Sequence, residues 1–83
     1  MTLASIERAM AVEGRGCLGK AKDDEPVFIL RAQDATAANI VRVWADGIAY
    51  HRGADHPKVV EARRLADMMD NWHEAGNATK IPD

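Results

Sequence analysis

The residues best suited to chemistry gather in the segment His51-Arg52-Gly53-Ala54-Asp55-His56-Pro57-Lys58. A glycine followed closely by a proline at the start of a helical pattern indicates a loop that leads into the N-terminus of a helix. Free backbone N–H groups and the positive end of the helix dipole attract anions to such a terminus. The side chains expected around a bound phosphate or carboxylate are Arg52, His56, Lys58, Arg63 and Arg64.

The charges of the helix expected after this loop run against its dipole. Its first half carries Lys58, Arg63 and Arg64, and its second half carries Asp67, Asp70 and Glu74. Acidic residues normally favour the beginning of a helix and basic residues its end. Exceptions to this preference are expected at functional sites. A solvated loop without a ligand is the favoured interpretation of this pattern. The alternative is a small anionic ligand, bound more tightly when His56 is protonated.

Other sets of reactive side chains are incomplete. His51, Asp55 and His56 are of metal-ligand type, but a fourth ligand is missing nearby, and Asp55 or His56 is needed as the cap of the next helix. We therefore expect no metal and no cofactor. His51 and His73 each fall on an apolar arc of a helical pattern, which favours a histidine at the core edge bonded to a backbone carbonyl over a general base.

A single cysteine, Cys17, lies in the glycine-rich run Gly14-Arg15-Gly16-Cys17-Leu18-Gly19. A reactive thiolate needs a helix N-terminus or a strong cationic neighbour, and Arg15 and Lys20 supply only a weak one. The glycines do not form a phosphate-binding loop, because no Gly-Lys-Ser/Thr sequence follows. No nucleophile–base pair or acid–base pair can be assembled, so the sequence predicts that the protein is not an enzyme.

The N-terminal half has weak element signals. Leu3, Ile6 and Met10 have helical spacing and predict a helix from residue 2 to about 12. Three glycines within residues 14–19 are costly in a helix and predict a loop.

A short apolar run follows at Val27–Leu30. It is rich in β-branched and aromatic residues and is preceded by Pro26, so it predicts a strand. A helix with Pro26 in its first turn and Asp24 or Glu25 as its cap is the alternative.

Two longer amphipathic helices are predicted in the C-terminal half, over residues 34–52, capped by Asp34, and 57 to about 75, with Gly53 and Gly76 as stop signals. The apolar arc of the first holds Ile40, Trp44, His51, Ala37, Ile48 and Val41, with Arg42, Asp46 and Asn39 opposite. The arc of the second holds Leu65, Trp72, Met69, Ala62, Ala66 and Val59. The short connection predicts an antiparallel hairpin with Trp44, Ile48, Leu65 and Met69 in its seam, and residues 77–83 are expected to form a flexible tail.

The predicted fold class is therefore mainly α, with a short N-terminal helix, one short strand and a C-terminal antiparallel helical hairpin in a single domain of residues 1–83. The core is thin, because 15 residues are alanine and only 16 are Val, Ile, Leu or Phe. Size scaling gives about 4900 Å² of surface for a compact monomer of this mass. A thin core and a lone strand both favour a homodimer. Its expected interface residues are Val27, Phe28, Ile29, Leu30 and Met68.

Composition excludes several classes of partner. The net charge of −2 and the pI near 5.9 argue against nucleic-acid binding. Neither an apolar run long enough for a membrane span nor a signal-peptide pattern is present, and a single cysteine is typical of a cytoplasmic protein.

The run Asp24-Glu25-Pro26-Val27-Phe28-Ile29-Leu30-Arg31-Ala32-Gln33-Asp34, with Val41, Trp44-Ala45 and Ala62 to Trp72, resembles small uncharacterised bacterial and prophage proteins. The resemblance covers roughly the last two thirds of the chain, leaves out residues 1–15 and brings no catalytic or ligand residues. It implies a small accessory protein, of the kind that phages use as inhibitors or decoys of host systems. We therefore expect a non-catalytic protein that binds a protein partner. A binder of an anionic metabolite or nucleotide at the Arg52–Lys58 loop is the alternative.

Overall fold

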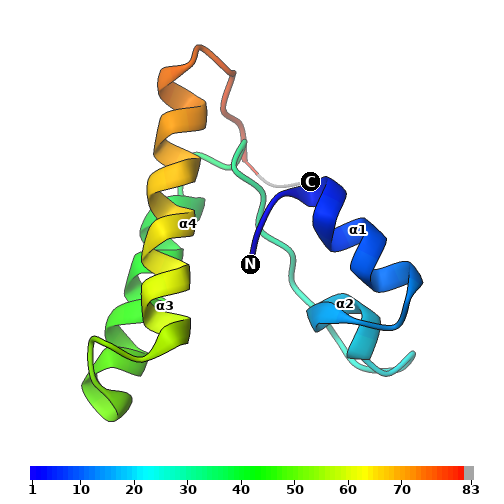
Figure 1. Cartoon of the computed structure of the whole chain (residues 1–83). Coiled ribbons are helices and arrows are strands. Elements are labelled where there is room, and N and C mark those ends of the chain that lie inside the picture. The colour runs from blue at the N-terminus through cyan, green and yellow to red at the C-terminus, as the bar shows by residue number, and fades with distance from the viewer. Residues whose placement is uncertain (82–83) are drawn as a thin grey trace.

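The computed structural model of the chain describes residues 1–81. These residues form four helices, α1 (Ala4–Val12), α2 (Gly16–Lys20), α3 (Ala37–Arg52) and α4 (Pro57–Glu74). The arrangement is open, because α1 packs against α2, α3 packs against α4, and no other two of these helices are in contact (Figure 1). The chain is therefore mainly helical, as its sequence predicts.

Small side chains form the contact between α3 and α4, which run antiparallel (Figure 1). The buried residues of the two helices are Ala37, Ala38, Ala45, Val59, Ala62, Ala66 and Met69. Alanine adds little bulk at a helix contact, so the two backbones can approach closely. Val59 is the one large side chain in the described residues that is completely buried. The core is thus as thin as the composition predicts.

The buried face of α3 is rotated away from the predicted arc. Trp44 and Ile40 are nearly half exposed, and His51 is exposed, so placing these side chains in or beside the seam was wrong. The alanines of α3 face α4 instead, and Val41 and Ile48 complete the contact. Of the large side chains, Val59 and Met69 of α4 are buried in the contact, whereas Trp44 and Ile40 of α3 stand outside it.

Ion pairs border this contact. Arg42 Nη2 lies 2.9 Å from an Asp67 carboxylate oxygen and 2.6 Å from one of Asp70, and Arg63 Nη2 lies 3.0 Å from Asp46. Hydrogen bonds that the Arg42 guanidinium donates to Asp70 and Asp67 raise the pKa of Arg42. Arg42 and Asp46, predicted to lie opposite the apolar arc, therefore reach α4. These pairs account for part of the reversed charge order of α4, because Arg63, Asp67 and Asp70 each meet an opposite charge on α3.

The glycine-rich run holds a helix where the sequence predicts a loop. Residues 16–20 form the single turn of α2, which lies against α1. A Cβ atom on Gly19 would stand 2.8 Å from the carbonyl carbon of Gly14 and 3.1 Å from Cα of Ala11. Gly14 and Gly16 have φ near +70°, which favours glycine in the turn between the helices. The glycines thus serve chain reversal and close packing.

The predicted strand is absent, and so is the alternative helix. The described residues contain one isolated bridge, between Asp34 and Lys80, and Val27–Leu30 lies in irregular structure that belongs to no helix or strand. A strand needs a neighbour, and no other segment pairs with these residues. Leu30 packs on the core, which fixes the end of the segment next to α3.

Three contacts hold the chain just before α3. His73 Nε2 is hydrogen-bonded to the carbonyl oxygen of Ala32, which confirms the predicted carbonyl partner for this histidine. Lys80 donates its backbone N–H to the oxygen of Gln33 at 2.8 Å and accepts from Ala35 at 3.3 Å. The expected tail is therefore bonded to the chain at residue 80, and residues 82–83 lie outside the described residues.

Asp34 forms the turn before α3. It is 3% exposed and accepts hydrogen bonds from the N–H and the hydroxyl of Thr36, each at 2.9 Å. The helix therefore begins at Ala37, after Thr36, and not directly after Asp34.

Candidate functional site

The predicted anion loop begins at Gly53, whose φ of +93° turns the chain between α3 and α4. His56 caps α4, because its Nδ1 accepts the backbone N–H of Lys58 at 3.1 Å. The N–H groups of Val59 and Val60 donate to the carbonyl oxygen of His56 at 2.9 and 3.1 Å. Pro57 carries no N–H, so the first turn of α4 has its backbone donors already bonded.

The five predicted cationic residues do not surround one common space. Lys58 pairs with Glu61 at 3.2 Å, and Arg63 pairs with Asp46 on the side that faces α3. Arg64 points to another side of α4, where it lines a hollow with Met1. An anion at this loop stays a prediction, and it would require Lys58 and Arg63 to leave their present carboxylates.

The other candidate reactive residues are dispersed. Among residues 1–81, no three His, Cys, Asp or Glu side chains lie close enough together to hold a metal ion. Cys17 is an exposed free thiol on the short helix α2. His51 lies near Tyr50, with the ring centroids 5.2 Å apart, and is exposed. None of the helices of the described chain is long and apolar enough to cross a bilayer.

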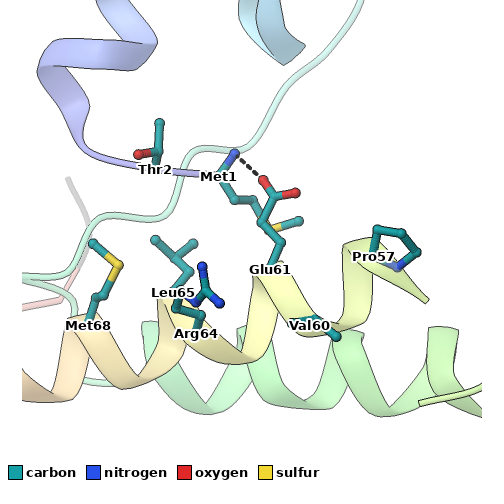
Figure 2. A pocket seen from close by; sticks show the side chains of 8 residues that line it. All are labelled: Met1, Thr2, Pro57, Val60, Glu61, Arg64, Leu65 and Met68. Atoms are coloured by element: carbon teal, nitrogen blue, oxygen red, sulfur yellow. Dashed lines mark ion pairs between the residues drawn. The ribbon is translucent and has the colours of Figure 1, made fainter. Parts of the chain in front are cut away.

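A hollow of about 510 Å³ lies between the first residues of the chain and the side of α4 that faces away from α3 (Figure 2). We call this side the outer face of α4. It consists of Pro57, Val60, Glu61, Arg64 and Met68. Leu65, which also packs on the core between α3 and α4 as predicted, lines the hollow together with Met1 and Thr2. Val60 and Met68 are 46% and 39% exposed. The fold thus leaves apolar side chains of a well-formed helix uncovered.

An ion pair holds the start of the chain beside this face. The Met1 ammonium lies 3.1 Å from Glu61 Oε1 (Figure 2) and 3.0 Å from Glu7 Oε1. Hydrogen bonds from the Met1 ammonium and Lys58 lower the pKa of Glu61 below its ordinary value of 4.5, against the opposing effect of desolvation. Desolvation alone would lower the pKa of the ammonium, but its bonds to Glu7 and Glu61 raise it above 8.0. The pair is therefore fully charged at neutral pH.

Within the described residues Arg64 has no ion pair, like Arg52 at the end of α3 and unlike Arg42 and Arg63. Among the residues that the structure describes, none offers it a hydrogen bond or a carboxylate, whereas Arg42 and Arg63 each have acidic partners. The charge pattern predicted Arg64 at an anion site and not among apolar neighbours. The signal that could have located it is the four-residue spacing of Val60, Arg64 and Met68, which lies outside the arc facing α3.

The remaining predicted interface residues lie on the segment before α3. Val27, Phe28 and Ile29 are 54%, 78% and 60% exposed, whereas Leu30 is partly covered by the core. The outer face of α4 and the segment Val27–Ile29 are thus two separate exposed apolar surfaces among those of the described residues.

Searches against protein-family models, curated proteins and solved structures found no match to this chain.

Proposed function

We propose that this chain is a non-catalytic binding protein that acts by occupying the surface of a protein partner with the outer face of α4. The observation that carries the proposal is the unpaired Arg64, which stands between the exposed apolar residues Val60 and Met68. Arginine and methionine are enriched at protein interfaces, and the flexible thioether adapts to an irregular partner. The partner surface is expected to be apolar, with a carboxylate that reaches Arg64.

A binding role is also supported by how the perturbed titratable groups are used. Among the residues that the structure describes, the groups with shifted pKa values are Met1, Arg42 and Glu61, and each of them takes part in ion pairs within the fold. A catalytic site normally needs perturbed groups that converge on a reacting atom. Inhibition of a larger host system, by covering a surface which that system needs, is the specific form of the proposal.

A photo-crosslinking amino acid at position 68 of the full chain tests the proposal in the cells from which the sequence comes. Position 43 is the matched control, because Val43 is 70% exposed on α3. We expect a discrete adduct with another protein from position 68 but not from position 43. Arg64→Glu should weaken that adduct by at least about tenfold, since the charge opposite the partner's carboxylate is reversed.

Equal labelling from both positions, or none from position 68, would contradict the proposal. A sole adduct with twice the mass of the chain would assign the outer face of α4 to self-association.

A further inference from the structure

The segment Pro26–Leu30 is the most exposed apolar stretch before α3. It passes between the α3–α4 hairpin and the α1–α2 pair (Figure 1). Within residues 1–81, its backbone N–H and carbonyl groups make no hydrogen bond, and Phe28 at its centre is 78% exposed. An apolar segment with unpaired backbone groups resembles the edge of a sheet that lacks its next strand. It is therefore suited to pairing with another extended chain.

The surface of the molecule is large for its mass. The described chain exposes 6342 Å², whereas a compact monomer of this size exposes about 4900 Å². The radius of gyration, 13.6 Å, likewise exceeds the roughly 11.8 Å expected for 83 residues. The excess of about 1400 Å² is more than the roughly 800 Å² that each partner buries in a standard stable interface. The open fold thus has enough surface for a dimer without losing an internal contact.

The segment Pro26–Leu30 has a similar order of apolar residue types when it is read in either direction from Phe28. Antiparallel pairing about a two-fold axis at Phe28 places Phe28 opposite its own copy and Val27 opposite Ile29 of the partner subunit. Both are favourable cross-strand pairs of aromatic or β-branched residues. One step outward, Pro26 lies opposite Leu30 of the partner subunit, so each apolar residue of the segment meets another.

Pro26 selects the hydrogen-bonding pattern of such a pair. Pairs alternate along an antiparallel ladder between those that exchange N–H···O bonds and those that do not. If the Phe28 pair is a non-hydrogen-bonded pair, the two Val27–Ile29 pairs are hydrogen-bonded pairs. Pro26 then lies at a non-hydrogen-bonded position, where the N–H that proline lacks would point away from the partner strand. The side chains of a non-hydrogen-bonded pair also lie closest together, which suits the two phenylalanine rings.

We propose that a second copy of this chain covers the segment Pro26–Leu30, by antiparallel pairing centred on Phe28. This interface is separate from the outer face of α4, so it goes beyond the proposed function, and each can fail without the other. The second copy is favoured over a different protein because the segment complements itself and because the surface excess exceeds what a dimer needs.

Sedimentation of the full chain at concentrations from about 1 to 100 µM tests the assembly. The expected result is a dimer whose dissociation constant rises at least about tenfold in Ile29→Pro, because proline removes two ladder hydrogen bonds across the axis. Met68→Glu, on the outer face of α4, is the matched control and should leave the dimer intact. Circular dichroism verifies that both variants keep their helices.

Disulfide formation tests the register and does not depend on the proline variant. In a Cys17→Ser background, Phe28→Cys should form a linked dimer under mild oxidation, because facing Cβ atoms in such a pair come within disulfide range. Val12→Cys, at a residue that is 88% exposed on α1, should not.

A monomer at every concentration, or a dimer that Met68→Glu dissociates and Ile29→Pro does not, would overturn the proposal. Equal linking through positions 12 and 28 would overturn the register.

Discussion

At the scale of single residues, the alanines in the contact between α3 and α4 determine how closely the two helices pack. Ala62 is completely buried in the contact, next to Ala45 and Val59. Extra methylene groups at such a site force a shift of the backbone or of neighbouring side chains.

We expect Ala62→Leu to lower the free energy of unfolding by about 1–3 kcal/mol, since overpacking is not relieved by open space. The matched control is Ala9→Leu on the exposed side of α1, which should change stability by no more than about 0.5 kcal/mol. Urea unfolding followed by circular dichroism measures both. Similar values for the two variants would mean that α3 and α4 are separated more widely than the structure has them.

Glu61 links the start of the chain to α4 in a pH-dependent way. Its pKa is lowered in the fold, so its contribution to stability is complete above about pH 4.5 and is lost as the pH falls through the lower folded value. The pKa of the Met1 ammonium is raised, so its contribution is complete below about pH 8.0 and is lost as the pH rises through the higher folded value.

Glu61→Gln should therefore destabilise the protein most between pH 4.5 and 8.0, and the difference from the parent should shrink on both sides of that range. Unfolding by urea at a series of pH values measures the difference. Glu74→Gln is the control, because Glu74 is exposed and lies outside this ion pair. A difference that is constant with pH would show that the ion pair does not contribute.

At the scale of elements, two glycines inside helices differ in whether the surrounding structure leaves room for a side chain. Gly19 has backbone atoms within 3.1 Å of where its Cβ would be, whereas Gly47, inside α3, has nothing within 4 Å. Gly19→Ala should separate α2 from α1. Gly47→Ala should raise the free energy of unfolding by up to about 1 kcal/mol, the usual preference of a helix for alanine.

Amide spectra and thermal unfolding of the two variants test this contrast. Unchanged signals from α1 and α2 in Gly19→Ala would show that the close approach of these two helices is not required.

Periodicity predicted the elements with strong patterns. α3 and α4 follow from their apolar spacing, and their ends follow from Gly53, Pro57 and Gly76. Propensity alone failed at α2, because the cost of glycine in a helix is outweighed there by the close packing that glycine allows. It also failed at Val27–Leu30, since a strand depends on a neighbour that no local pattern can supply.

Which residues lie at the helix contact could not be read from hydrophobicity. An arc centred on Trp44 maximises apolar character, whereas the fold uses the alanines beside it and directs Arg42 and Asp46 to ion pairs with α4. The distance between two helices and the pairing of their charges depend on both helices together, so the apolar pattern of one helix does not predict them.

At the scale of the whole molecule, the two helical pairs are connected by an exposed segment. Phe28 and Tyr50 are similarly exposed, at 78% and 87%, but only Tyr50 lies in a helix. At submicromolar concentration, where association is weakest, chymotrypsin should cut first after Phe28, because a protease needs an extended backbone. Mass spectrometry of the first fragments decides this, and initial cleavage after Tyr50 would contradict it.

The separation of the two helical pairs has a consequence for the order of folding. Within each pair, contacting residues are joined by a short loop, so both pairs should assemble rapidly and independently. The Met1–Glu61 ion pair and the Ala35–Lys80 bond instead close loops of about 60 and 45 residues, which carry the larger entropy cost. These long-range contacts should form last and break first, so the transition state contains the hairpin of α3 and α4 without its connections to the chain termini.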